Sequence, residues 1–333
     1  MIRAGTDPQA IELAAQTLAQ GELLGLPTET VYGLAADAAS DAAVAKVYAA
    51  KNRPADHPLI VHVSDAGRVA EFASQVPAFA QRLIDAFWPG PLTLILPRRE
   101  GQAAAAAGGQ DSIGLRCPSH PVAQAILRAA WAHGVHGVAA PSANRFGRVS
   151  PTTARHVVDE LGEQLLVIDG GACDVGIEST IIDCTRGVPV LLRPGVLDRT
   201  ALEAAAGMPL RERDDPELQQ AKATPRASGT LASHYAPAAR VLLMDAHELA
   251  QALAALQPGD PAPAVYARSA LPAGLRGDVV VRAMPADAAA VAHDLFAVLH
   301  ELDALGVSAI WIERPPSDDH WEGVRDRLQR AAA

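Results

Sequence analysis

The sequence predicts an α/β protein with a large, twisted mixed sheet covered by helices and a smaller C-terminal α/β domain. Its 333 residues exceed the usual size of one hydrophobic core. Up to about residue 200, helical and strand-like segments intermix without strict alternation, which favours a mixed sheet. A polar, proline-containing stretch then precedes a series in which strands and helices nearly alternate. We therefore expect domains at 1–208 and 239–333, joined by a linker or lid segment at 209–238.

Capping signals and apolar runs place the elements of the larger domain. Asp7 and Pro8 are typical of a helix N-cap followed by proline at the first helical position, and Gly21 is a typical helix end. Further helices are predicted at 41–50, with Asp41 as the cap, after Ser64, and at 77–87, 121–131 and 151–161. Strands are predicted at 22–26, 59–63, 92–96, 113–116, 137–140, 165–169, 179–184 and 188–193, the last two joined by a turn at 185–187. The alanine-rich run 103–107 is expected to be a surface loop.

The smaller domain shows the pattern of a largely parallel sheet. Its strands are predicted at 240–244, 264–267, 278–282 and 307–312, and its helices at 247–256, 286–304 and 318–330. This part of the sequence contains no G-x-G-x-x-G motif, so we assign it no dinucleotide.

The composition argues against several classes of protein. A formal net charge of −10 disfavours a protein that grips nucleic acid through a broad basic face. The three cysteines have no C-x-x-C spacing, and their odd number gives no disulfide framework, which favours a reducing compartment. No apolar run approaches the about 20 residues of a membrane span, and the N-terminus lacks the pattern of a signal peptide. We expect a cytoplasmic protein that does not enter membranes.

The most informative stretch contains a pair of cations. Lys51 and Arg53 lie two positions apart next to Pro54 and Pro58. Side chains at i and i+2 of an extended chain project to the same side, so the pair is predicted to form a stiff fork for phosphate oxygens. A lone K-x-R pair is more often a solvated basic turn, but here further polar clusters follow along the chain.

Those clusters come at successive predicted strand ends. Arg116 precedes a proline turn in G-L-R-C-P, Ser142 and Asn144 follow a strand in A-P-S-A-N, and Arg193 precedes a proline in L-L-R-P-G. Ser150 is predicted to cap the helix that starts at Pro151, and a helix N-terminus also favours phosphate.

A glycine-rich stretch, Asp169–Asp183, allows close backbone approach to a ligand and ends in the hydroxyls of Ser179 and Thr180. By itself it is as consistent with an ordinary hairpin loop.

The usual catalytic templates are missing from the sequence. It contains no G-x-S-x-G, H-E-x-x-H or Walker A motif. His133 and His136 have no carboxylate or cysteine at ligand spacing, so we interpret them as structural or exposed. The remaining arginines, lysine, hydroxyls and glycine loops suit an anion and an amino acid. They favour transfer between two bound substrates, with the protein positioning them and neutralising charge.

Taken together, the motifs resemble those of a known family. They are P-T-E-T-V-Y-G-L, K-x-R-P followed by P-L-I-V-H, W-P-G-P-L-T, G-L-R-C-P, P-S-A-N, I-E-S-T-I-I-D and L-R-P-G. They resemble the YrdC family, and S-H-Y-A-P at 233–237 with the C-terminal extension is similar to its long, two-domain (Sua-type) threonylcarbamoyl-AMP synthases. The resemblance covers essentially the whole chain. It implies a YrdC-like twisted mixed sheet and a Rossmann-like C-terminal domain.

The resemblance also implies a nucleotidyltransferase reaction. L-Threonine, bicarbonate and ATP, with Mg²⁺ held by the ATP phosphates and not by a cage of protein carboxylates, would give threonylcarbamoyl-AMP and pyrophosphate. The product would pass to a tRNA threonylcarbamoyltransferase complex that modifies adenosine 37 of tRNAs reading codons that start with A. Stable nucleic-acid binding by this chain is not expected.

Site residues are carried over by position. Lys51, Arg53, Ser142 and Asn144 match the catalytic phosphate-binding positions; Thr30, His62, Arg116, Ala140 and Thr180 match the L-threonine positions; His57, Ser112, Ser150, Arg193, His234 and Tyr235 match further ATP contacts. Arg116 would pair with the threonine carboxylate. Three places depart from the common pattern. Asn52 replaces a glycine, and His57 replaces an asparagine, which makes its ATP contact sensitive to pH. Ser228-Gly229-Thr230 stand where linkers of the long form often read P-G-M.

Two other functions are less consistent with the sequence. Carbamoyl transfer of the hydrogenase-maturation kind shares the YrdC-like module, but those proteins carry an acylphosphatase-like domain and zinc-finger cysteine pairs that this sequence lacks. A double-stranded RNA-binding or ribosome-assembly module is disfavoured by the negative net charge.

Overall fold

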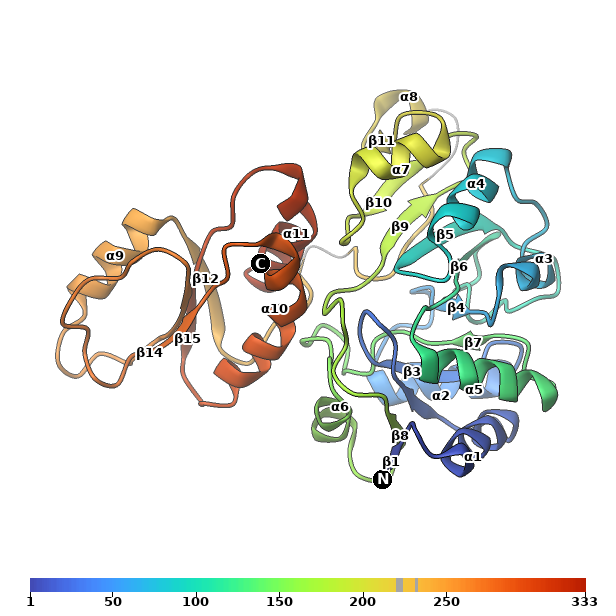
Figure 1. The fold of residues 1–333 in the computed structure, drawn as a ribbon, viewed down its shortest axis with the longest axis horizontal. Coiled ribbons are helices and arrows are strands. Elements are labelled where there is room, and N and C mark those ends of the chain that lie inside the picture. The colour runs from blue at the N-terminus through green and yellow to red at the C-terminus, as the bar shows by residue number, and fades with distance from the viewer. Residues whose placement is uncertain (220–223, 231–232) are drawn as a thin grey trace.

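The computed structural model describes residues 1–219, 224–230 and 233–333 and contains two separate sheets (Figure 1). The larger sheet has the strand order β1-β8-β2-β3-β7-β4-β6-β5-β9-β10-β11, and the smaller has the order β12-β15-β13-β14. Parallel and antiparallel pairs alternate irregularly in the larger sheet, whereas every pair in the smaller one is parallel. The predicted α/β fold class is confirmed.

The elements of the larger unit are short. Its strands are β1 (Ile2–Ala4), β2 (Leu24–Leu26), β3 (Gly33–Asp37), β4 (Ile60–His62), β5 (Leu92–Pro97), β6 (Ser112–Arg116), β7 (Val138–Ala139), β8 (Leu166–Asp169), β9 (Thr180–Asp183), β10 (Val190–Arg193) and β11 (Arg211–Glu212). Its helices are α1 (Pro8–Ala19), α2 (Asp41–Lys51), η1 (Ala66–Arg68), α3 (Val69–Phe72), α4 (Ala78–Phe87), α5 (Pro121–Ala132), α6 (Ala154–Leu161), α7 (Arg199–Ala206) and α8 (Pro216–Gln219).

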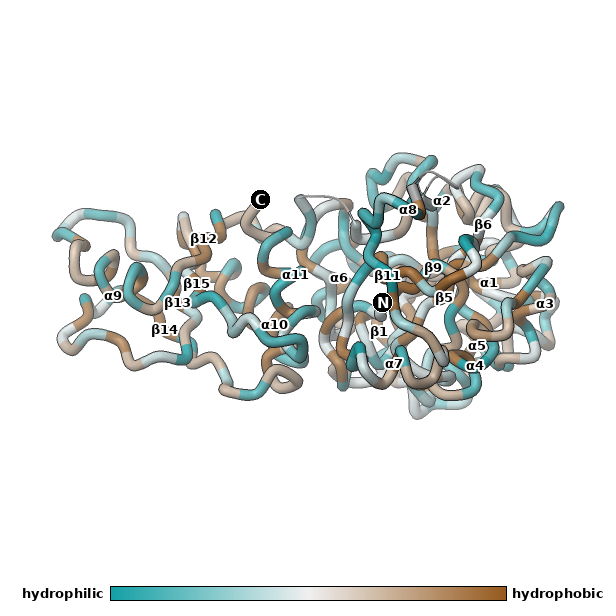
Figure 2. Tube along the Cα trace, turned by 90° about the horizontal axis from the view of Figure 1, so that it is seen from above, coloured by the Kyte–Doolittle hydropathy of each residue, from teal (hydrophilic) through white to brown (hydrophobic). Residues whose placement is uncertain are grey.

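Helices pack on both faces of the larger sheet and bury its central strands on both sides, whereas β1 at one edge is exposed. On β3, Ala35 packs in the same cluster as α1 and α5, while Leu34 and Ala36 pack with α2 and α4. This alternation follows the two-residue period of a strand. Figure 2 shows hydrophobic residues along β5 and β9 in the interior of this unit.

The smaller unit places two helices against the larger one. Its strands are β12 (Arg240–Met244), β13 (Ala264–Ala267), β14 (Val280–Ala283) and β15 (Ala309–Glu313), and its helices are α9 (Ala246–Ala255), α10 (Ala288–Asp303), η2 (Asp319–Trp321) and α11 (Glu322–Ala331). Helices α10 and α11 lie between the small sheet and the larger unit, and α9 lies on the far side (Figure 1). Their apolar cluster also includes Val31, Val149, Ile177 and Tyr235, so the two units share a core.

Two glycines allow the backbones of the two units to meet. Gly176 has a φ of +80°, and a Cβ built there would lie 2.2 Å from the carbonyl oxygen of His293 in α10. A Cβ on Gly323 of α11 would lie 2.4 Å from the carbonyl oxygen of Gly195. Contact at this distance is possible only without a side chain.

Several local predictions are wrong. Lys51 is the last residue of α2 and Asn52 adopts a left-handed conformation with φ of +52°, so Lys51 and Arg53 do not form a fork on extended chain. Left-handed backbone is what glycine or asparagine tolerates best, which explains why Asn52 can replace glycine here.

Two predicted helix caps are also wrong, and one predicted surface loop is partly buried. Ser40, and not Asp41, caps α2. Thr153, and not Ser150, caps α6, which starts at Ala154. Within the run 103–107, Ala103, Ala106 and Ala107 are buried, while Ala104 is exposed.

Other elements were not anticipated. They are β1, β3, α7, and the short β11 and α8 within the segment expected to be a linker. Within the described ranges, every helix is too short or too polar to cross a membrane.

Candidate active site

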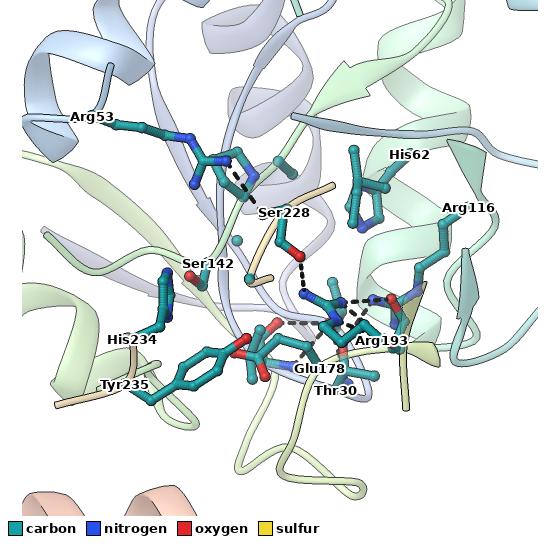
Figure 3. Close-up of a pocket in the computed structure, with 18 residues that line it drawn as sticks. Thr30, Arg53, His62, Arg116, Ser142, Glu178, Arg193, Ser228, His234 and Tyr235 are labelled. Carbon is teal, nitrogen blue, oxygen red and sulfur yellow. Dashed lines mark hydrogen bonds between the residues drawn. The ribbon is translucent and has the colours of Figure 1, made fainter. Parts of the chain in front are cut away.

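One polar pocket collects most of the predicted site residues. It lies where loops and strand ends of the larger sheet meet the segment that leads to β12. Nine of the predicted residues line it: Thr30, Arg53, His62, Arg116, Ala140, Ser142, Arg193, His234 and Tyr235. Figure 3 shows that they enter from opposite sides, with His62 and Arg116 facing the pair His234 and Tyr235.

Arg116 lies at the end of β6, and protein acceptors use only some of its N–H donors. Its Nη1 donates to Thr30 Oγ1 at 2.7 Å and its Nε donates to the Gly90 carbonyl at 3.3 Å. Its Nη2 lies 2.7 Å from a carboxylate oxygen of Glu29, and both side chains are buried. A guanidinium carries five N–H donors. One N–H on each terminal nitrogen therefore remains for a ligand.

Burial raises the pKa of the Glu29 carboxyl, but the charge of Arg116 and their contact lower it by more, so the net pKa is below its usual value. Glu29 therefore stays ionised and neutralises Arg116 from behind. The carboxylate is not among the residues that line the pocket.

His62 presents a neutral imidazole to the pocket. Burial, followed by the charge of Arg116, lowers the pKa of His62 to about 3. Its Nδ1 is buried and has no hydrogen-bond partner within the described part of the chain. A buried ring nitrogen without a partner is costly and points to a missing ligand.

Lys51 holds a loop in place and does not line the pocket. Its Nζ donates to the carbonyl oxygens of Ser142 at 2.5 Å and of Asn144, and the side chain is buried. Burial and then the charge of Arg53 lower the pKa of Lys51 well below its usual value. The amine thus fixes the Ser142–Asn144 loop from below.

Asn144 is fixed in the same way, because its Nδ2 donates to the carbonyls of Arg145 and Arg148. Its Oδ1 is buried and, within the described residues, has no partner.

Two buried arginines in the pocket contact only neutral groups in the described structure. Arg53 donates to the carbonyls of His57 and Pro58 and to the hydroxyl of Ser228. Arg193 donates to the carbonyls of Ser179 and Ser228 and to the Ser179 hydroxyl. Burial lowers the pKa of Arg53 to about 10 and also lowers that of Arg193. Two buried cations without a direct anionic partner make this wall suited to an anion.

The chain beyond β11 closes the pocket. Ser228, Gly229, His234 and Tyr235 all line it, and the arginines named above hold Ser228. Burial lowers the pKa of His234 to about 3 and raises that of Tyr235 to about 12, so both are neutral near pH 7. Residues 220–223 and 231–232 of the predicted lid lie outside the described residues.

Five predicted residues besides Lys51 lie outside the pocket wall. Asn144 and Ser150 are buried but do not line it, and Thr180 follows the lining residue Ser179 with its Oγ1 buried and unpartnered among the described residues. His57 stacks edge-on against Phe146, and burial lowers its pKa. Ser112 lines a neighbouring pocket.

That neighbouring pocket is mainly apolar. Its walls include Ile60, Ile95 and Ile181, and it shares Ile60 and Ser228 with the first pocket. The two pockets are therefore adjacent: the first is lined by charged side chains and the second is mainly apolar.

Sequence reasoning missed two acidic residues. Glu178 lines the pocket and Glu29 pairs with Arg116, yet a search for anion-binding residues passes over carboxylates. Their place within P-T-E-T and I-E-S-T, next to hydroxyls that were selected, was the available signal.

His133 and His136 lie away from this site. His133 Nε2 is 2.8 Å from Glu12, and His136 lies 2.9 Å from Glu71 and stacks on Trp131.

Comparisons with known proteins point in one direction. A family model described as "Telomere recombination" (Sua5, yciO, yrdC) matches residues 16–195, and one described as "Threonylcarbamoyl-AMP synthase, C-terminal domain" matches residues 197–333. The chain is 34% identical to the threonylcarbamoyl-AMP synthase of Pyrococcus abyssi over 342 residues, covering 99% of this chain and 96% of that one. It is 40% identical to the synthase of Bacillus subtilis over 241 residues, covering 72% and 67%. The crystal structure of P. abyssi Sua5 complexed with L-threonine is similar with a TM-score of 0.86 and 33% identity, covering 97% and 94% of the two chains.

Proposed function

The chain belongs to the two-domain, Sua5-type threonylcarbamoyl-AMP synthases, which carry out the first step of threonylcarbamoyladenosine formation in tRNA, and we propose that the pocket described above is where it binds ATP beside L-threonine. The enzyme is a nucleotidyltransferase. We infer that its substrates are L-threonine, bicarbonate and ATP and that it releases pyrophosphate. The observation that carries the assignment of the site is the pair of buried arginines, Arg53 and Arg193, whose direct partners in the described structure are neutral.

The triphosphate occupies the wall formed by these arginines and the Ser142–Asn144 loop. A polyanion supplies the charge that the arginines lack, and Lys51 keeps the loop carbonyls turned away from it. The adenine occupies the apolar pocket lined by Ile60, Ile95 and Ile181, with Ser112 at its edge. Because the two pockets share Ser228, one nucleotide can span both.

L-Threonine binds on the opposite side, near Thr30, His62, Arg116 and Ala140, with Thr180 behind that wall. The free N–H on each terminal nitrogen of Arg116 receives the carboxylate. The solved P. abyssi relative is a complex with L-threonine, which supports an amino-acid site in this fold.

The residues also fit a magnesium ion that arrives with ATP. Mg²⁺ prefers oxygen ligands and commonly keeps phosphates and water in its shell. The unpartnered Oδ1 of Asn144 and the hydroxyl of Ser142 can supply oxygens, and the described chain has no cluster of three or more acidic, histidine or cysteine side chains to form a cage. When bound, the ion would neutralise phosphate charge.

The protein's part in the chemistry is to position and to neutralise. The attacking atom is a carbamate oxygen made from threonine and bicarbonate, so no protein nucleophile is required. Arg53 and Arg193 stabilise the charge that develops on the phosphates and the departing pyrophosphate. His62 is neutral and can accept a hydrogen bond at its free Nδ1.

The segment 209–238 acts as a lid between a catalytic domain at 1–208 and a C-terminal domain at 239–333. Ser228 bridges both arginines, and Tyr235 packs into the core of the C-terminal unit. Nucleotide binding and domain contact therefore meet in one segment. We further propose that the enzyme acts in the cytoplasm and passes its product to a tRNA threonylcarbamoyltransferase complex.

Pyrophosphate release tests the site. Purified protein with ATP, Mg²⁺ and bicarbonate should release pyrophosphate only when L-threonine is added, and Arg53→Ala should suppress that release. The matched control is Arg99→Ala, which removes an arginine that does not line the pocket. Threonine-dependent release that survives in Arg53→Ala would place the phosphates elsewhere.

A further inference from the structure

A buried arginine from the C-terminal unit reaches the back of the pocket. Arg327, in α11, is fully buried. Its Nε donates to Glu178 Oε2 at 2.8 Å, its Nη2 donates to the Glu178 carbonyl at 3.0 Å, and its Nη1 donates to the Pro194 carbonyl at 2.7 Å. The Nη1 also donates to Asp326 Oδ2 at 2.8 Å, and that carboxylate pairs in turn with Arg330. One guanidinium thus holds both the side chain and the backbone of a residue that lines the pocket of the other unit.

Glu178 connects this arginine to the nucleotide side of the pocket. Its second oxygen, Oε1, accepts from the hydroxyl of Ser150, which is also buried. Burial raises the pKa of the Glu178 carboxyl, but the charges of Arg327 and then Arg193 lower it by more, so the carboxylate is ionised. Figure 3 shows Glu178 in the pocket beside Tyr235 and Arg193.

An ionised carboxylate in this place is at odds with a site for a triphosphate. Like charges repel strongly in a partly dehydrated pocket. Without Arg327, Glu178 would turn to Arg193 for its counter-charge or oppose the phosphates directly. Because Arg327 forms an ion pair with Glu178, the charge of Glu178 is neutralised from outside the pocket. Arg193 therefore remains available to contact the ligand.

We propose that Arg327 is a positioning residue for the synthase reaction, because it neutralises Glu178 and fixes Ser150 so that the pocket accepts ATP. The C-terminal unit then completes the nucleotide site through one side chain. This inference rests on the nucleotide site proposed above.

Charge neutralisation and simple domain anchoring predict different results in a double variant. Arg327→Met should weaken ATP binding by about 30-fold or more, because truncating one partner of a buried charge pair at a binding site costs about 2 kcal/mol at the least, while L-threonine binding stays unchanged. Glu178→Gln combined with Arg327→Met removes the charge at position 178, keeps an acceptor for Ser150 and leaves Asp326 in its ion pair with Arg330, so it should regain most of the lost ATP affinity. The readouts are ATP and L-threonine affinities by calorimetry, and the separate KM and kcat values for both substrates.

The control is Arg148→Met. Arg148 forms an ion pair with Asp303 across the same domain boundary, at 3.2 Å, without lining the pocket. It should leave the ATP affinity unchanged.

Three results would overturn the proposal: an Arg327→Met enzyme with normal ATP affinity, equal losses for ATP and L-threonine, or a folded double variant that binds ATP as weakly as Arg327→Met. If Arg327→Met alone does not fold, the double variant decides, since it should fold and bind ATP nearly as the unmodified protein does. Arg53→Ala distinguishes a failure of the proposed nucleotide site from a failure of the proposed role of Arg327. Normal ATP affinity in Arg53→Ala removes the proposed nucleotide site, whereas weak binding there with normal binding in Arg327→Met removes only the role of Arg327.

Discussion

Removing Arg116 should destabilise the protein in a way that depends on pH. In Arg116→Met the Glu29 carboxylate loses its ion pair, in which both side chains are about 5–6% exposed and the charged atoms are 2.7 Å apart. Breaking a buried pair by removing one partner costs about 3–5 kcal/mol of unfolding free energy. We expect a loss of that size at pH 7.

The pH dependence follows from the carboxyl left behind. In the unmodified protein Arg116 keeps the pKa of Glu29 below its ordinary value of 4.5, so the pair contributes stability above that pH and loses it as pH falls further. In the variant the largest remaining influence is burial, which raises the pKa of Glu29 and is opposed only by backbone hydrogen bonds from Glu29 and Ser119. The folded variant then binds a proton before the unfolded chain does, so its stability deficit should shrink on acidification, by up to about 1.4 kcal/mol per pH unit.

Urea unfolding at pH 7 and pH 5, followed by tryptophan fluorescence, measures this deficit at both values. Arg282→Met is the control, because Arg282 pairs with Glu301 in a half-exposed ion pair that is worth at most about 1 kcal/mol. Adding Glu29→Gln to Arg116→Met should recover much of the loss at pH 7 without restoring L-threonine binding. An equal deficit at both pH values, or no recovery in the double variant, would refute the view that Glu29 is held ionised by Arg116.

Three further predictions concern the lid, the domain contact and the buried histidines. Tyr235→Phe should leave the fold intact but weaken ATP binding if the segment is a lid, whereas unchanged calorimetric affinity would make its hydroxyl irrelevant to the site. Gly176→Ala should lower the thermal midpoint of unfolding, because the new Cβ would meet the His293 carbonyl. Gly147 is the control: it has a similar φ of +84° but open space around it, so Gly147→Ala should cost only the backbone strain. Equal midpoints in the two variants would contradict the close contact at Gly176. Between pH 6.5 and about 3 the protein should lose stability as the pH falls, because His234 binds a proton in the unfolded chain but stays neutral in the folded protein. His234→Gln should reduce the slope of unfolding free energy against pH by up to about 1.4 kcal/mol per pH unit. An unchanged slope would show that His234 does not contribute.

The sequence predicted most elements because their signals are local. Asp7 and Pro8 do begin α1, and all four strands of the C-terminal sheet were located, as was their parallel arrangement. By contrast, β1 is three residues long and exposed, and its strand character comes from pairing with β8, far along the chain. Gly33–Asp37 has no β-branched residue and forms β3 only because β2 and β7 flank it. Such strands depend on tertiary contacts, which local patterns do not contain.

At the site, the sequence was a good guide to which segments come together but a poorer guide to the contacts that each side chain makes. Arg53, Arg116 and Arg193 come from segments far apart and do line one pocket. Lys51 was expected beside Arg53 in a fork, yet the helix end at Asn52 turns its amine toward the Ser142–Asn144 loop. Ser150 was expected as a helix cap and instead donates to Glu178. A one-dimensional pattern shows a donor or a cation but not the partner that folding brings to it.

The shared core explains why the C-terminal unit matters to a pocket that lies mainly in the other unit. Val31 follows Thr30 in the pocket loop and packs in the same apolar cluster as Leu295 and Phe296 of α10, and Tyr235 packs there while its other side lines the pocket. Shifting α10 would therefore move a threonine-side loop and a lid residue together. Arg327 adds a charge to the same boundary. Domain separation should thus disturb ATP and L-threonine sites at once, whereas loss of the Arg327 charge should disturb ATP alone, and that contrast distinguishes packing from electrostatics as the route of coupling.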